Sequence, residues 1–233
     1  MLYYLNKGRG RHCPICNKSF RKFGDCGNPK RKDALCYHCG SLERHRLVWL
    51  YLKRMTALFD EPSKSMLHVA PEPCFENLFK KHLGQGYIST DIQNPRAIVK
   101  MDVTDINFPD ETFDVIYCSH VLEHISEDKQ ALREFHRVLK SDGWAILLVP
   151  IKLNLKRTFE DPSVTDPMER LRLFGQEDHV RRYGRDFCDR VREANFFVNV
   201  IKPADFLSEK EIELMGITKT AGEIYYCTKN PPT

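Results

Sequence analysis

This sequence of 233 residues lacks the two features that would place a protein in a membrane or direct it across one. It has no run of about eighteen apolar residues, the length that a membrane-spanning helix needs. Its first twelve residues, MLYYLNKGRGRH, also lack the apolar stretch of a secretory signal peptide. We therefore expect a soluble, cytoplasmic protein with no membrane partner.

Acidic residues are scarce at the N-terminal end. Residues 1–58 contain thirteen Lys and Arg against three Asp and Glu, although the whole chain carries a net charge of only +4. Such a basic segment can attract RNA or another polyanion, and it can equally be a solvated face. The pattern therefore permits a nucleic-acid partner for the N-terminal part without requiring one.

Glycine is absent from a turn where it would be expected. The stretch MLHVAPEPCFENLF, residues 66–79, has the pattern of a buried strand, a tight turn and a helix start. At such a turn a nucleotide-type cofactor usually approaches the backbone, and glycine leaves room for it. Ala70 still permits a close approach, and Pro73 suits the first turn of a helix. Glu72 adds a negative charge that would be unfavourable beside an anionic part of a ligand.

Five of the nine cysteines lie within the first forty residues. Four of them form two C-x-x-C pairs, Cys13 with Cys16 and Cys36 with Cys39, and nineteen residues separate the pairs. This spacing is typical of a four-cysteine Zn²⁺ site, in which each short turn presents two thiolates to one ion. Because four thiolates fill a tetrahedral ion, the predicted zinc is structural. Disulfides are the alternative, which a cytoplasmic setting disfavours. Three spare residues of ligand type are Cys26, His12 and His38.

The chain divides by pattern into three predicted parts. Residues 1–41 form a small zinc-ribbon-like module, residues 42–60 a linking helix, and residues 61–233 a larger α/β domain. Ser41 has the residue type of a helix N-cap, and apolar positions of helical period follow it. Residues 44–46, Arg-His-Arg, could contact substrate, but an exposed basic start of this helix is the commoner arrangement and the one we expect.

Beyond residue 60, short apolar runs alternate with helical stretches. This is the pattern of a largely parallel sheet with helices on both faces. The last two runs leave room for only a short helix between them, so the final pair of strands can be antiparallel. We predict an α/β fold with a doubly wound, seven-stranded, Rossmann-like sheet. The predicted strands are residues 66–69, 87–90, 97–100, 113–118, 144–149, 196–201 and 223–228.

The residues that follow these strands are candidates for ligand binding, because ligands of an open parallel sheet bind beyond the carboxyl ends of its strands. Asp91 follows the second strand, where a carboxylate can accept hydrogen bonds from both hydroxyls of a ribose. Asp102 follows the third strand, and Ser119 and His120 follow the fourth. Asp91 and Asp102 can equally be turn-forming residues.

Residues 99–150 resemble the core of class I S-adenosylmethionine-dependent methyltransferases. The family pattern is D-x-x-x-L-P-F-x-D-x-S-F-D-x-V, then L-E-H, then a helix with R-V-L-K-P-G-G. This chain has Asp102, NFPD at 107–110, FD at 113–114, LEH at 122–124 and RVLKSDG at 137–143. The resemblance implies a methyl transfer with S-adenosylmethionine as the cofactor. It also implies that Asp91 binds the ribose, that Asp102 and Val103 contact adenine, and that Ser119 and His120 line the methionine end.

The first motif departs from the family, which has an acid followed by G-x-G-x-G. Here His68 stands in the place of the acid. A narrower set of bacterial-type methyltransferases resembles this chain in combining CGSLERHR (39–46), H-x-A-P-E (68–72) and FGQ-x-DHVR-x-YG (174–184). This second resemblance suggests that the glycine-free motif is a trait of the set. The cofactor-binding residues implied for the motif are Val69, Ala70, Pro71 and Glu72.

A long connection, residues 151–184, follows the fifth predicted strand and is typical of a lid or binding loop. It contains Asp178 and His179, an acid and a possible general base. His179 is therefore the catalytic candidate, although a surface histidine bonded to backbone fits the sequence too. Methyl transfer by alignment of the reactants alone is a further possibility.

Three functions fit these patterns. The leading prediction is a zinc-containing, S-adenosylmethionine-dependent methyltransferase whose acceptor is RNA or a small molecule. The first alternative is a non-catalytic, zinc-containing binding protein with a degenerate methyltransferase fold, which the glycine-free motif suggests. The second is a nicotinamide-dependent oxidoreductase, which would also use Asp91 but lacks G-x-G-x-x-G.

Overall fold

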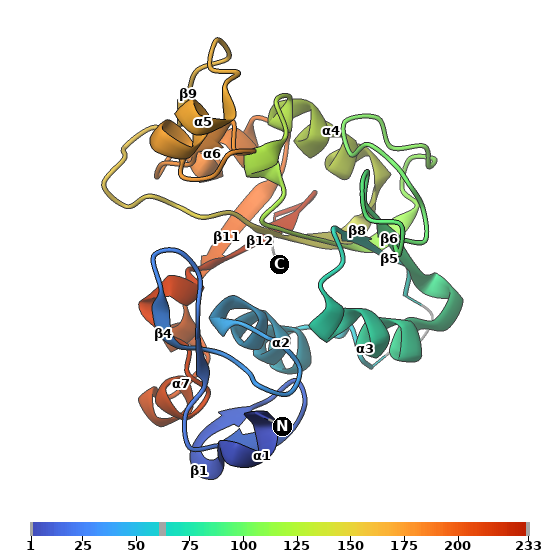
Figure 1. The fold of residues 1–233 in the computed structure, drawn as a ribbon. Helices are drawn as coiled ribbons and strands as arrows, with labels where there is room; N and C mark the ends of the chain where they lie inside the picture. The colour runs from blue at the N-terminus through green and yellow to red at the C-terminus, as the bar shows by residue number, and fades with distance from the viewer. Residues whose placement is uncertain (1, 61–63, 232–233) are drawn as a thin grey trace. The chain divides into compact units, whose positions relative to one another are not determined.

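The computed structural model describes residues 2–60 and 64–231. The chain forms two compact units, each assembled from separate segments, and Figure 1 traces their elements. Unit 1 comprises Met1–Ser63, Glu72–Gly84 and Ile201–Glu223, and unit 2 comprises Lys64–Pro71, Gln85–Val200 and Ile224–Thr233. No helix within the described ranges is long and apolar enough to cross a bilayer. The domain boundaries expected at residues 41 and 60 stay a prediction.

Unit 1 begins with a short helix and two small antiparallel hairpins. Each hairpin carries one C-x-x-C pair: the first pair lies at the turn of hairpin β1–β2, and the second directly follows β4. Since these strands are short, each hairpin buries few apolar side chains by itself. The elements are α1 (Leu2–Leu5), β1 (Lys7–Cys13), β2 (Lys18–Phe20), β3 (Gly24–Cys26) and β4 (Arg31–Leu35).

The predicted linking helix is present as α2 (Glu43–Met55), but its start differs from the prediction. The N-cap is Leu42 rather than Ser41. The expectation of an exposed basic start at residues 44–46 is wrong, because Arg46 is fully buried. A guanidinium has five N–H donors, and here several backbone carbonyls converge on it. Arg46 donates hydrogen bonds of 2.6 to 3.0 Å to the carbonyl oxygens of Ala34, Ser41, Met215 and Gly216.

Aromatic rings join α2 to α3 (Pro73–Leu83) within unit 1. The ring of Trp49 stacks on Phe75 with 6.1 Å between centroids and lies 6.4 Å from Phe79. Pro73 occupies the first turn of α3, as predicted. The remaining elements of the unit are η3 (Pro203–Asp205), α7 (Glu209–Leu214) and η4 (Lys219–Ala221).

Unit 2 is an α/β unit on a six-stranded sheet with the order β11-β12-β8-β7-β5-β6. Strands β6, β5, β7 and β8 pair in parallel, whereas β12 runs antiparallel to β8. The prediction of a mostly parallel sheet is therefore confirmed. The strands are β5 (Met66–Val69), β6 (Tyr87–Thr90), β7 (Phe113–Ser119), β8 (Leu139–Leu148), β11 (Phe197–Ile201) and β12 (Ile224–Thr228).

The strand predicted at residues 97–100 is wrong, so the sheet has six strands rather than seven. This segment makes a single parallel bridge, between Thr90 and Val99. A turn at Asn94, whose carbonyl accepts a hydrogen bond of 3.1 Å from the amide of Ala97, occupies the residues before it. Another turn begins at Asp102, since its side chain accepts from the amide of Thr104. Between the two turns the pairing with β6 is limited to this bridge.

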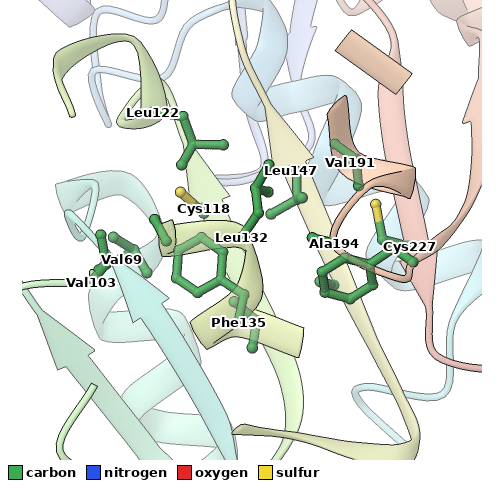
Figure 2. Close-up of a cluster of buried hydrophobic side chains, with 14 of the residues drawn as sticks. Val69, Val103, Cys118, Leu122, Leu132, Phe135, Leu147, Val191, Ala194 and Cys227 are labelled. Atoms are coloured by element: carbon green, nitrogen blue, oxygen red, sulfur yellow. The ribbon is translucent and has the colours of Figure 1, made fainter. Parts of the chain in front are cut away.

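The apolar core of unit 2 lies between the sheet and two helices that cover one face of it, α4 (Asp128–Val138) and α6 (Phe187–Arg192) (Figure 1). The buried positions of α4 recur at helical spacing, which gives the helix one apolar face. Figure 2 shows Leu132 and Phe135 of α4 beside Cys118 and Leu147 of the central strands. This packing fixes the strand ends that carry the polar residues of the site.

The connection expected as a lid has structure of its own. It contains β9 (Phe159–Glu160), α5 (Pro167–Phe174) and β10 (Arg181–Arg182), with β9 and β10 paired. Arg181 is 3% exposed, and it donates hydrogen bonds to the carbonyl oxygens of Leu122, at 2.8 Å, and Ser126, at 2.7 Å. The C-terminal part of the connection is thereby fixed to η2 (Leu122–His124) and to the residues before α4.

Candidate functional site

A cavity of about 700 Å³ lies in unit 2, within the size range of small-ligand sites. It is formed at the carboxyl ends of parallel strands, where ligands of such sheets bind. Five of the nine residues predicted for cofactor binding line it: Val69, Asp91, Asp102, Val103 and His120. The other four, Ala70, Pro71, Glu72 and Ser119, are not among its lining residues.

Asp91 directly follows β6, and its carboxylate is held by a turn. Oδ1 accepts hydrogen bonds from the amides of Gln93, at 2.7 Å, and Asn94, at 2.8 Å. Within the described chain no hydrogen bond is made to Oδ2. The turn-forming and ligand-binding interpretations of Asp91 are therefore compatible, because one oxygen serves the turn and the other is available to a ligand hydroxyl.

Asp102 and Val103 reach the cavity from the turn after the bridged segment. Asp102 Oδ1 accepts from both the amide and the hydroxyl of Thr104, each at 2.8 Å, so it too is a turn residue. The carboxylate of Asp102 is exposed, whereas Val103 is 6% exposed and belongs to the core. The pair thus offers an acceptor and an apolar surface side by side.

The glycine-free turn keeps a backbone conformation that glycine favours. Ala70 has φ of 49°, in the left-handed region, and its amide donates to the carbonyl oxygen of Thr90 at 2.8 Å. An L-residue in this conformation is under strain, whereas glycine is not. Glu72 belongs to unit 1, where its Oε1 lies 3.6 Å from Nε2 of His45. The unfavourable charge expected from Glu72 is therefore directed toward an imidazole.

Ser119 is the last residue of β7, and His120 follows it. The Ser119 side chain is buried, and its hydroxyl has no hydrogen-bond partner in the described chain. His120 has φ of 56°, so a second left-handed residue follows a central strand. Its Nδ1 lies 3.3 Å from Oε1 of Glu123. Strained backbone of this kind is frequent at binding sites.

His179, the catalytic candidate, is 6% exposed and does not line the cavity. Burial lowers the pKa of its imidazole, which favours the neutral ring. The carboxylate of the neighbouring Asp178 lies 3.1 Å from Nδ1 of His124. The ring of His124 in turn lies edge-on to His179, with centroids 4.6 Å apart. A general-base role for His179 stays a prediction.

Glu123 and His124 are the residues that sequence reasoning missed, although both belong to the LEH motif. Glu123 is buried, whereas His124 and Asp178 line the cavity. The signal was the spacing of His120, Glu123 and His124, which puts three ligand-type side chains within about one helical turn.

The four cysteines of unit 1 form a compact cluster. Their Sγ atoms all lie within 4.8 Å of one another, with 3.6 Å from Cys13 to Cys39 and 3.7 Å from Cys16 to Cys36. A tetrahedral ion with Zn–S bonds of about 2.3 Å separates its sulfurs by about 3.8 Å, so the cluster fits zinc. The hydroxyl of Ser41 lies 3.3 Å from the sulfurs of Cys13 and Cys39. The spare residues Cys26, His12 and His38 are not part of the cluster.

Known proteins resemble this chain in sequence and in fold. Residues 55–147 match the family described as "Methyltransferase domain". YcgJ of Bacillus subtilis (strain 168), described as an uncharacterized methyltransferase, is 35% identical over 74 residues, which cover 32% of this chain and only 27% of that protein. The structure of an S-adenosylmethionine dependent methyltransferase from Mesorhizobium loti has a TM-score of 0.51 at 14% identity, covering 78% of this chain and 97% of that chain. The family match covers residues 55–147, and the solved structure shows that the fold is shared.

Proposed function

We propose that the chain is an S-adenosylmethionine-dependent methyltransferase and that the cavity of unit 2 holds the cofactor. The observation that supports this most directly is the position of Asp91. It follows β6 at the edge of a cavity of suitable size, with Oδ1 engaged by the turn and Oδ2 left for a ligand. A carboxylate at this place suits the paired hydroxyls of a ribose.

The chain's own residues would then bind and orient the cofactor. Asp91 accepts hydrogen bonds from the ribose, and Asp102 and Val103 offer an acceptor and an apolar contact to adenine. Val69 and His120 line the cavity from the ends of β5 and β7, on the side assigned to the methionine end. When bound, S-adenosylmethionine supplies an electrophilic methyl group, so the protein has mainly to align the acceptor with it.

Calorimetric titration with S-adenosylmethionine tests this proposal. Asp91→Asn keeps an oxygen for the turn but removes the charge, and we expect affinity to fall about 10- to 100-fold, the loss of one charged hydrogen bond. Asp161→Asn is the matched control, because Oδ1 of Asp161 makes the same kind of turn with Ser163 and does not line the cavity. If folded, zinc-loaded protein binds no cofactor, the alternative of a non-catalytic binding protein is favoured.

For the acceptor we propose RNA, bound through the basic residues of unit 1. The support is a set of exposed cations on the two hairpins and on the segment between them. Asp25 is an exposed acid in the same region. Binding of an RNA oligonucleotide should weaken steeply between 50 and 200 mM salt, by about tenfold or more if several phosphates are contacted. A flat salt response would instead favour a small-molecule acceptor. The exposed cations are Lys7, Arg9, Arg21, Lys22, Lys30 and Lys32.

A further inference from the structure

A second group of metal-ligating side chains lies in unit 2, apart from the four cysteines. Glu123, His124 and His179 each offer one ligand atom, and these atoms all lie within 4.8 Å of one another. Ligand atoms about 2.1 Å from one ion are at most about 4.2 Å apart. Side-chain movements of less than an ångström therefore bring the three atoms to bonding distance of a single cation.

Two of these side chains are buried with polar atoms unpaired. Glu123 is 1% exposed and its Oε2 has no hydrogen-bond partner in the described chain; the same holds for Nε2 of His179, which is 6% exposed. Burying a carboxylate without a full countercharge is costly. Nδ1 of His120 lies 3.3 Å from Oε1 of Glu123, and no Lys or Arg of the described residues forms an ion pair with this carboxylate. A divalent cation would supply both the missing positive charge and the missing partners.

The surroundings hold these groups in place. The amide of Val180 donates to the carbonyl oxygen of Glu123 at 2.9 Å, which joins the two chain segments that carry the ligands. Asp178 lies 3.1 Å from Nδ1 of His124, so Nδ1 takes the proton and Nε2 is left as the electron-pair donor. A carboxylate behind a histidine in this way is the usual second layer of a metal site, because it fixes the tautomer and the ring orientation.

We propose that Glu123, His124 and His179 form a site for one divalent transition-metal ion at the wall of the cavity. Two imidazoles and a carboxylate suit Zn²⁺, Co²⁺ or Mn²⁺, and three protein ligands leave a coordination position open. Because His124 and Asp178 line the cavity, that position is accessible from it. If the cavity has the function proposed above, the ion would polarise the oxygen of a hydroxyl-bearing acceptor, a role open to such ions.

Zinc stoichiometry of the full chain is the first test. After equilibrium dialysis against Zn²⁺, metal analysis should give two equivalents for the wild type, one for the cysteines and one for the new site. Glu123→Gln and His179→Gln should each retain one equivalent. His82→Gln is the matched control, since Nε2 of His82 is also buried without a partner but lies in α3, outside the cluster. It should retain two.

A second measurement uses the wild-type protein alone, so it does not depend on whether the variants fold. Mn²⁺ binds poorly to thiolates but well to carboxylate and imidazole, so the loss of the free-ion electron paramagnetic resonance signal should report one site in wild-type protein. One zinc equivalent with no Mn²⁺ bound would overturn the proposal, as would a second equivalent that survives in both variants. Calorimetry with S-adenosylmethionine on the same samples tests cofactor binding separately from metal binding, because the ion can bind whether or not the cofactor does.

Discussion

The two units use their polar side chains in opposite ways. In unit 1, four thiols and a buried guanidinium lie at the centre, where they join short hairpins to α2 and to residues 215–216. In unit 2, a six-stranded sheet and two helices form an apolar core; the buried Arg181 holds one connection, but the polar groups of the candidate site lie at the strand ends beside a cavity. Where apolar packing already holds a fold, buried polar groups without partners are available for ligands. Where it does not, the polar groups are needed for the fold itself.

The largest effect should follow removal of one cysteine of the cluster. Cys36→Ser takes away one of four proposed zinc ligands, and the apparent binding energy of such an ion, about 10–16 kcal/mol, is comparable to the whole stability of a domain. We expect loss of the tightly bound zinc and of the folded structure of unit 1, measured by metal analysis and circular dichroism.

Cys26→Ser is the control for this experiment, because Cys26 lies on β3 outside the cluster. It should keep both the zinc and the thermal transition. A Cys36→Ser protein that unfolds at the wild-type temperature would show that unit 1 is held together without metal, and the contrast between the two units would then fail.

The second effect concerns the buried guanidinium. Arg46→Met keeps most of the side-chain volume but removes the donor to four carbonyl oxygens, of which that of Ser41 also accepts from the amide of Cys36. Each unpaired buried acceptor costs about 1 kcal/mol or more, so we expect a loss of about 3–5 kcal/mol in the free energy of unfolding by urea. Arg54→Met, which removes a pair with Glu211 from a side chain 38% exposed, should change stability by less than about 1 kcal/mol. Equal losses in the two variants would contradict a special role for Arg46.

These two cases show what the sequence can and cannot predict. The cysteine cluster was predictable because its four ligands lie on two local turns of known spacing. Arg46 was not, since a basic residue is exposed by default and two of its partners, Met215 and Gly216, are far away in the sequence. The cavity residue Asp91 followed from the alternation of strands and helices, which places strand ends at one edge of the sheet. Asp102 was placed there through a strand at residues 97–100 that the structure reduces to a single bridge.

The Glu123 and His179 pairing escaped sequence reasoning for the same physical reason as Arg46. It depends on hydrogen bonds between segments far apart in the chain, from the amide of Val180 to Glu123 and from Arg181 to Leu122 and Ser126. The strand predicted at residues 97–100 failed for a local reason instead. Its apolar run was identified correctly, but turns on both sides, at Asn94 and Asp102, shorten the extended part to a single bridge.

The third effect tests whether charged pairs of unit 2 contribute less to the free energy of unfolding than its apolar core does. Hydrogen bonds from Arg137 lower the pKa of Glu134, whose Oε2 also accepts from the amide of Ile106 at 2.8 Å. A lowered pKa stabilises the fold above about pH 4.3, the ordinary value for Glu, and this contribution is lost as the pH falls through the lowered pKa. Glu134→Gln should therefore cost about 1 kcal/mol at pH 7, and the difference from wild type should shrink in acid.

Urea unfolding at a series of pH values measures this difference. Glu169→Gln is the control, because Glu169 pairs with Arg172 on the exposed surface of α5, and no change in stability is expected. A cost for Glu134→Gln that stays constant down to pH 3 would mean that the side chain acts through packing rather than charge.

The smallest effect concerns the glycine-free turn. Ala70 in the left-handed region costs about 1 kcal/mol relative to glycine. Replacing it with glycine removes this cost, but part of the gain in stability is offset because glycine loses more entropy on folding. Ala70→Gly should therefore raise the free energy of unfolding by about 0.5 kcal/mol, whereas Ala97→Gly, at a residue without positive φ, should lower it by a similar amount. Because the backbone of residue 70 already adopts the conformation that glycine favours, the affinity for S-adenosylmethionine should stay within about threefold of wild type. A large gain in affinity for Ala70→Gly would instead show that the Cβ atom of Ala70 obstructs the cofactor, and that the motif is degenerate rather than adapted.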